Sequence, residues 1–289
     1  MSTHTPNAPR LVVTGATGFI GQHVVAELQC RGIKPLLMIR SSSALPEALK
    51  EYPVVEADLH APPTALYEKL GQPDLLIHLA WNGLPNYKSL HHFESELPAH
   101  YLFLKGLLEA GLPNLVVTGT CFEYGMQSGV LHEEMESRPD NPYGFAKETL
   151  RRQMLFLQQK TPFNLTWARL FYLFGEGQGA NSLLPQLRHA VESGASQFNM
   201  SGGEQLRDYL PVKQVARYLV DLALTSRYNH GLVNICSGQP ISVRRLVENW
   251  IHENGWPITL NLGFYPYPNY EPMAFWGDRS KLERCLTQR

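Results

Sequence analysis

Short apolar runs alternate with amphipathic segments through residues 11–254 of the chain. The apolar, β-branched runs predict buried strands over residues 11–14, 35–39, 54–57, 74–79, 115–118, 165–170 and 232–235. Helical periodicity and capping residues predict helices over 20–31, 62–70, 93–110, 141–160, 183–192, 212–224 and 242–254. Because strands and helices alternate, we expect an α/β fold with a doubly wound parallel sheet and right-handed crossovers.

The pattern becomes irregular after residue 172, where a Gly-rich stretch (175–179) is followed by separated helices and strands. Residues 264–272 contain three prolines and cannot form a helix. We therefore expect residues 1–171 and about 206–235 to form a nucleotide-binding domain. Residues of about 172–205 and 236–289 would form a smaller, discontinuous substrate lobe.

Composition narrows the class of protein. Hydrophobic residues make up 44% and charged residues 18% of the chain, as in globular proteins, and the net charge is -1. Nothing global indicates binding to nucleic acid or to a membrane surface. Residues 1–10 are polar, no long apolar run follows, and four scattered cysteines lack metal-ligand spacing. We expect a cytoplasmic protein with reduced thiols and no metal site.

A glycine motif follows the first predicted strand and leads into a helix. Glycines at 15, 18 and 21 would allow a tight turn and a close approach of a dinucleotide pyrophosphate to the helix N-terminus. The expected cofactor contacts here are Gly15, Thr17, Gly18, Phe19, Ile20 and Gly21. The alternative is a glycine-rich strand–helix turn that binds nothing.

The ends of the next strands bear on the choice of cofactor. Arg40 and three serines follow the second strand, where NAD-binding proteins carry an acid, so NADP(H) is favoured over NAD(H). The alternative for Arg40 is a solvated loop arginine. Asp58 and Leu59 would contact the adenine, unless Asp58 only forms an Asp turn. Leu79 and Ala80 are further expected cofactor contacts, whereas His78 is interpreted as a hydrogen-bonded core residue.

Residues 141–147 (Asn-Pro-Tyr-Gly-Phe-Ala-Lys) have the composition of a helix start. Asn141 would cap the helix and Pro142 would occupy its first position. Tyr143 and Lys147 would then lie one turn apart on one face. The neighbouring ammonium and the helix dipole predict a lowered pKa for the phenol, which would suit acid–base catalysis.

Two further segments carry candidate polar groups. Thr120 follows the fifth strand, and its hydroxyl could reach Tyr143 or merely hold a turn; Cys121 beside it is interpreted as a buried, unreactive thiol. Arg207 precedes Asp208 and Tyr209, and its guanidinium suits either a structural ion pair or a substrate diphosphate.

Together, residues 14–21 (Thr-Gly-Ala-Thr-Gly-Phe-Ile-Gly), Thr120, the Tyr143/Lys147 pair and residues 207–209 resemble the extended short-chain dehydrogenase/reductase family. Within it, the nucleotide-sugar epimerases, dehydratases and reductases are most similar. The resemblance implies that Tyr143 is the acid/base, that Lys147 binds the nicotinamide ribose, and that Thr120 holds the substrate oxygen. It also implies a homodimer formed through helices 93–110 and 143–160.

Departures from the family pattern narrow the reaction. Cys121 and Phe122 stand where 4,6-dehydratases carry Asp-Glu, which argues against dehydration. Trp81 replaces a family alanine and would narrow the sugar site or stack on a hexose. The sequence is most similar to reductases of nucleotide-linked 4-keto-6-deoxyhexoses, with a 4-epimerase or a non-catalytic NADP-binding regulator as alternatives. Expected substrate contacts are Trp81, Cys121, Asn181 and Arg207, with Arg188 or Lys213 as further diphosphate-binding candidates.

Overall fold

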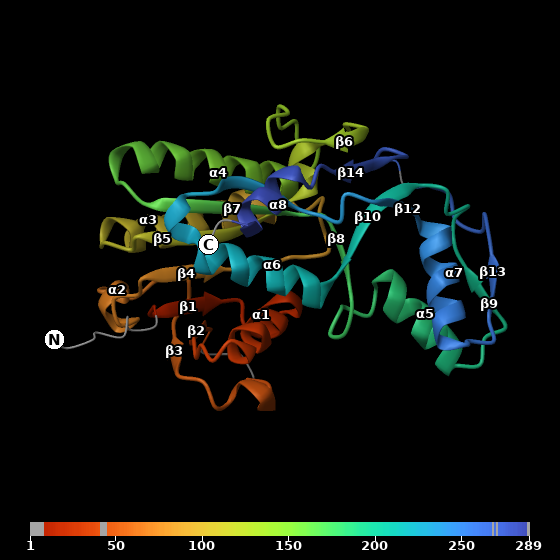
Figure 1. Ribbon diagram of the computed structural model, residues 1–289, viewed down its shortest axis with the longest axis horizontal. Helices are drawn as coiled ribbons and strands as arrows, with labels where there is room; N and C mark the ends of the chain where they lie inside the picture. The colour runs from red at the N-terminus through yellow and green to blue at the C-terminus, as the bar shows by residue number, and fades with distance from the viewer. Residues whose placement is uncertain (1–8, 41–44, 268, 270, 288–289) are drawn as a thin grey trace.

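The computed structural model describes residues 9–40, 45–267, 269 and 271–287. Its main sheet has seven parallel strands in the order β11-β7-β5-β4-β1-β2-β3 (Figure 1). These strands are β1 (Leu11–Thr14), β2 (Leu36–Ile39), β3 (Val54–Glu56), β4 (Leu75–His78), β5 (Asn114–Thr120), β7 (Asn164–Leu170) and β11 (Gly231–Ile235). The predicted doubly wound α/β fold is confirmed.

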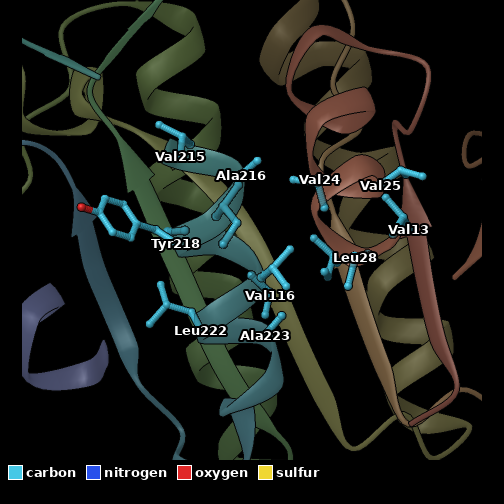
Figure 2. Close-up of a cluster of buried hydrophobic side chains, with 14 of the residues drawn as sticks. Val13, Val24, Val25, Leu28, Val116, Val215, Ala216, Tyr218, Leu222 and Ala223 are labelled. Carbon is cyan, nitrogen blue, oxygen red and sulfur yellow. The ribbon is translucent and has the colours of Figure 1, made fainter. Parts of the chain in front are cut away.

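Helices cover both faces of this sheet. Helices α1 (Phe19–Cys30), α6 (Val212–Leu224) and α8 (Ser280–Thr287) pack on one face. Helices α2 (Leu66–Lys69), α3 (Leu97–Glu109) and α4 (Pro142–Lys160) pack on the other. Figure 2 shows apolar side chains of α1 and α6 meeting next to Val116 of β5. Burial of such side chains is the main stabilising contribution to the fold.

A smaller region lies beyond one end of the sheet strands (Figure 1). It contains α5 (Leu183–Glu192), α7 (Val243–Asn254), and the paired strands β9 (Gln197–Asn199) and β13 (Thr259–Asn261). Its separate core includes Leu187, Phe198, Val247 and Trp250. Strands β8 (Tyr172–Phe174), β10 (Leu206–Pro211) and β12 (Pro240–Ser242) form a three-stranded sheet, and β6 (Gly129–Leu131) pairs with β14 (Phe275–Gly277). The division into two domains stays a prediction.

Some elements differ from the predicted ones. The helix expected over 62–70 is only the single turn α2, because Pro63 disfavours a helical residue before it and Ala65 has a left-handed φ of 55°. The helix expected over 93–110 begins as a π-helical turn, η2 (His92–Glu96), and continues as α3. Helix α8 places Leu282 and Cys285 in the core beside α6. No helix in the described part of the chain is long and apolar enough to cross a membrane.

Candidate active site

The glycine turn between β1 and α1 is packed directly against the end of β4. Gly15 has a φ of 71°, and a Cβ at this position would lie 2.6 Å from the amide nitrogen of Ala80. A Cβ at Gly21 would lie 2.0 Å from the carbonyl oxygen of Gly15. Both positions therefore require glycine, and the turn leaves the N-terminus of α1 free to bind an anion.

Two cavities open along the carboxyl ends of the strands. The first, here called the glycine-turn cavity, has a volume of about 230 Å³ and is lined by the predicted cofactor residues Gly15, Thr17, Gly18, Arg40, Leu59, Leu79 and Ala80. The second, the Tyr143 cavity, has a volume of about 560 Å³. The predicted residues lining it are Gly15, Gly18, Phe19, Ile20, Gly21, Leu79, Trp81, Thr120, Cys121, Tyr143 and Asn181. The cavities share Gly15, Gly18, Leu79 and Trp81, so they adjoin.

The residues expected at the adenosine end of the cofactor are only partly brought together. Arg40 is exposed at the end of β2 and lines the glycine-turn cavity, while serines 41–43 lie outside the described residues. Asp58 lines neither cavity. Its carboxylate accepts a hydrogen bond of 2.9 Å from the His60 amide, which is the Asp turn named as the alternative.

Helix α4 begins as predicted and places Tyr143 at the floor of its cavity. The Asn141 side chain accepts a hydrogen bond of 2.9 Å from the Gly144 amide, and Pro142 is the first helical residue. The Tyr143 ring is surrounded by aromatic rings, with centroid distances of 5.2 Å to His92 and 5.7 Å to Tyr87. The phenol is thereby held in an enclosed environment with an exposed fraction of 8%.

The predicted lowering of the Tyr143 pKa is wrong for this structure. Burial raises the pKa of the phenol well above its usual value, and the neighbouring Tyr87, Glu123 and Cys121 raise it further. A hydrogen bond with Thr120 acts in the opposite direction but is outweighed. Because the phenolate would lose its hydration here, Tyr143 is protonated at neutral pH.

Thr120 is held by a buried network that the sequence analysis did not identify. Its amide donates a hydrogen bond of 2.8 Å to Glu123, and its hydroxyl accepts one from the Phe122 amide, which forms a capping box at the start of η3 (Cys121–Tyr124). Glu123 also accepts hydrogen bonds from Trp167 and Arg169. The Thr-x-x-Glu spacing is the sequence signal for this capping box.

Lys147 lies one helical turn after Tyr143 but lines neither cavity. Its exposed fraction is 2%, and its ammonium donates a hydrogen bond of 2.9 Å to the Thr118 carbonyl oxygen. The same ammonium lies 4.0 Å from the centroid of the Trp81 ring. Burial lowers the pKa of Lys147 to about 7.

A buried chain of polar groups behind Trp81 was also missed. His78 hydrogen-bonds to the Thr14 hydroxyl at 2.8 Å and to His100 at 2.7 Å. His100 continues to the Glu96 carboxylate at 3.1 Å. Burial raises the pKa of Glu96, but hydrogen bonds from His100 and the Asn82 amide outweigh it and hold the value at about 2. His78 is thus a hydrogen-bonded core residue, as predicted.

The remaining predicted substrate contacts have different surroundings. Cys121 is 6% exposed, as predicted for a buried thiol, and burial raises the pKa of that thiol; its lack of reactivity stays a prediction. Arg207 forms a buried ion pair of 2.8 Å with Glu271 and lines neither cavity, which is the structural alternative. Arg188 and Lys213 are exposed and line neither cavity.

Comparison with known proteins gives consistent matches over nearly the whole chain. The dTDP-6-deoxy-L-talose 4-dehydrogenase (NAD(+)) of Aggregatibacter actinomycetemcomitans is 31% identical over 269 residues, covering 92% of this chain and 98% of the relative. The UDP-glucose 4-epimerase of Halalkalibacterium halodurans is 22% identical, covering 96% and 89% respectively. The solved structure of MoeE5 in complex with UDP-glucuronic acid and NAD is 27% identical, with a TM-score of 0.81 and coverage of 96% and 92%.

The sequence profile of the NAD dependent epimerase/dehydratase family matches residues 11–236, which contain the glycine turn, Thr120, Tyr143 and Lys147. The glycine turn, Thr120 and Tyr143 lie at adjoining cavities on the carboxyl edge of a doubly wound parallel sheet, and Lys147 is buried one helical turn after Tyr143. The chain therefore belongs to the NAD-dependent epimerase/dehydratase family of extended short-chain dehydrogenase/reductase enzymes.

Proposed function

We propose that this enzyme reduces the C4 ketone of a nucleotide-linked 4-keto-6-deoxyhexose, with NADPH as the favoured hydride donor. The relative from Aggregatibacter is named as a 4-dehydrogenase of a dTDP-linked 6-deoxyhexose. Reduction of a 4-ketone is the reverse of 4-dehydrogenation. The proposed reaction therefore has the same class of sugar and the same reacting carbon, C4, as the reaction in the relative's name.

The Tyr143 cavity carries this proposal. Among the described residues that line it, none has a charged side chain, and the walls near Tyr143 include Trp81, Leu84, Tyr87 and Phe122. A 6-deoxyhexose has a methyl group in place of the C6 hydroxyl, and such a group is favourably buried against apolar walls. None of the described lining residues could form an ion pair with the carboxylate of a uronic acid.

The protonated phenol of Tyr143 is in the form that the reductive direction requires. Its raised pKa keeps the phenol protonated at neutral pH, as a general acid requires. When bound, the nicotinamide cofactor supplies a hydride to C4. Tyr143 would give its phenolic proton to the oxygen on C4, and the Thr120 hydroxyl would hold that oxygen by a hydrogen bond. The phenolate left behind would then take a proton from solvent.

The residues around the glycine-turn cavity fit a dinucleotide. The turn at Gly15 admits no Cβ, the N-terminus of α1 suits a pyrophosphate, and Arg40 at the cavity suits a 2′-phosphate. We therefore keep NADP(H) as the favoured cofactor, although the Aggregatibacter relative is named for NAD(+) and the MoeE5 structure contains NAD. Lys147 would bind the nicotinamide ribose, and the lobe would supply the remaining contacts to the nucleotide sugar.

Two other functions are testable alternatives. A nucleotide-sugar 4-epimerase would use Thr120, Tyr143 and Lys147 in the same roles and retain its cofactor. The names of two relatives above, a 4-dehydrogenase and a 4-epimerase, both place the reaction at C4. A non-catalytic NADP-binding regulator would not need Tyr143 and Thr120 to meet at the cavity.

Mixing the enzyme with a dTDP- or CDP-linked 4-keto-6-deoxyhexose and NADPH, then NADH, distinguishes these functions. Stoichiometric loss of nicotinamide absorbance, faster with NADPH, is expected for the reductase. A separate incubation with a dTDP- or CDP-linked hexose that carries a hydroxyl on C4 tests the epimerase. Inversion of that hydroxyl without net cofactor loss, and no reduction of the 4-ketosugar, would identify the protein as an epimerase and not a reductase. Tight cofactor binding with neither reaction would indicate the regulator.

Tyr143→Phe tests the proposed acid. The substitution removes the proton donor and keeps the aromatic packing, so we expect kcat to fall about 10²- to 10⁴-fold. Tyr228→Phe, at a phenol with an exposed fraction of 42% in η4 (Ser226–Tyr228), is the matched control and should retain full activity. Undiminished reduction by the Tyr143→Phe enzyme would rule out this mechanism.

A further inference from the structure

The buried ammonium of Lys147 has few partners that could compensate for its lost hydration. In the described parts of the chain, the ammonium donates a hydrogen bond to the Thr118 carbonyl oxygen, and the carboxylates of Glu123 and Glu96 act on it through charge and not as ion-pair partners. An ammonium has three N–H donors, and the Thr118 carbonyl oxygen accepts a hydrogen bond from one of them. The other close group is the face of the Trp81 indole, whose centroid is 4.0 Å away.

Trp81 is itself held in place by neighbouring side chains. Its indole N–H donates a hydrogen bond of 3.1 Å to His92, and its ring packs against the His100 ring at a centroid distance of 4.4 Å. Trp81 also lines both the glycine-turn cavity and the Tyr143 cavity. The indole is thus a fixed wall between the two cavities, with Lys147 against its face.

We propose that Trp81 is a positioning residue that holds the Lys147 ammonium behind the wall shared by the two cavities through a cation–π interaction. The quadrupole of an indole attracts a cation over its face, and this attraction increases when the cation is desolvated, as Lys147 is. Trp81 therefore stabilises the charged form of Lys147 and fixes the place from which it acts on bound cofactor.

Other ionisable groups also affect the charge state of Lys147, and their effects must be distinguished from the effect of Trp81. They come from four elements besides α4: His78 of β4, His92 and Glu96 of η2, His100 of α3, and Glu123 of η3. Glu123 and Glu96 favour the charged form of Lys147, although neither is its ion-pair partner.

Fluorination of tryptophan tests the interaction without changing the packing. Truncating Trp81 would admit water and so raise the pKa of Lys147 for an unrelated reason. Biosynthetic incorporation of mono-, di- and trifluorotryptophan instead reduces the electron density of the ring at nearly constant size. The pKa of Lys147 is read from the ¹³Cε resonance of labelled lysine, assigned by its loss in Lys147→Met.

We expect the midpoint of Lys147 to fall stepwise with fluorination, by about one pH unit across the series. The chain contains five tryptophans, and Trp167 donates to Glu123, so fluorination there could act through that carboxylate. The series is therefore repeated in Trp81→Phe, where the ring at position 81 takes no fluorine and the midpoint should be independent of the label. Trp81→Tyr serves as the same control if the phenylalanine variant does not fold.

A Lys147 midpoint that does not change with fluorination would overturn the proposal. A stepwise fall of the midpoint that persists in the Trp81→Phe background would also overturn it. The catalytic consequence rests on the proposed function: the pH profile of kcat/KM for 4-ketosugar reduction should shift with the same midpoint. A shifting midpoint in a protein inactive on 4-ketosugars would reject the proposed function and retain the role of Trp81. Reductase activity together with a constant midpoint would reject the role of Trp81 and retain the proposed function.

Discussion

The phenol of Tyr143 and the ammonium of Lys147 are both almost excluded from water, with exposed fractions of 8% and 2%. Burial disfavours the charged form of each group, so it raises the pKa of Tyr143 and lowers that of Lys147. Sequence spacing placed the two residues on one helical face but could not show this burial. The rings responsible, from Trp81, Tyr87, His92 and Phe122, belong to other segments.

Lys147→Met should remove a pH-dependent loss of stability. The pKa of Lys147 is about 7 in the folded protein and about 10.4 in an unfolded chain, so between these values the unfolded state binds more protons. The wild-type protein must therefore gain stability as the pH rises from 7 towards 10. Compared with the wild type, the free energy of unfolding of Lys147→Met should be highest below pH 7. The difference in unfolding free energy between the two proteins should narrow by pH 9.

Urea unfolding of both proteins at pH 6, 7.5 and 9 measures this difference. Lys213→Met, at an exposed lysine on α6, should follow the wild type at every pH. A stability difference between Lys147→Met and wild type that stays constant with pH would show that Lys147 keeps its ordinary pKa in the folded state.

At the level of elements, local sequence signals were sufficient to predict the start of α4. They were not sufficient to predict the buried hydrogen-bond network of Glu123 that holds Thr120. Asn141, Pro142 and the helical pattern are adjacent in sequence, and they define the start of α4 in the structure. Glu123 and Arg169 lie on η3 and β7 and form an ion pair of 2.7 Å with neither side chain exposed. No sequence periodicity pairs residues so far apart. The pair depends on β5 and β7 being neighbours in the sheet.

Glu123→Ala should destabilise the fold and disturb Thr120. Removing one member of a buried ion pair leaves an uncompensated charge and costs about 3–5 kcal/mol of unfolding free energy. Glu136→Ala breaks the exposed ion pair with Arg138 and should cause no measurable change. Urea denaturation compares the two variants, and equal stabilities would show that the Glu123–Arg169 pair contributes nothing to the fold.

For the whole molecule, apolar runs predicted every strand of the main sheet, because the inner parallel strands are buried on both faces and the edge strand β3 still has the residues Val54 and Val55. They did not predict the strand order, since each run satisfies the same pattern. Nor did they place α8, whose Leu282 and Cys285 return from the end of the chain to the core beside α6. Such assignments depend on which surfaces meet after folding, and a single local segment does not contain that information.

The face formed by α3 and α4 bears on the predicted homodimer. These helices contact each other on one side of the sheet and expose large apolar side chains, with Leu102 61%, Phe145 49% and Phe156 71% accessible. An apolar surface shared by two adjacent helices is typical of an interface between copies of a chain. The resemblance to the short-chain dehydrogenase/reductase family independently implies a dimer through the same helices.

Phe156→Glu tests this dimer. A carboxylate repeated across a symmetric interface would be buried without a partner, so we expect a dimeric wild-type enzyme and a monomeric variant by size-exclusion chromatography with light scattering. Phe264→Glu, at a phenylalanine with an exposed fraction of 57% outside these helices, is the matched control and should remain dimeric. A monomeric wild type, or a Phe156→Glu dimer as tight as wild type, would exclude an interface centred on α4. Because Phe156 lies far along α4 from Tyr143, a monomer that keeps its cofactor affinity would also show that each copy forms its own site.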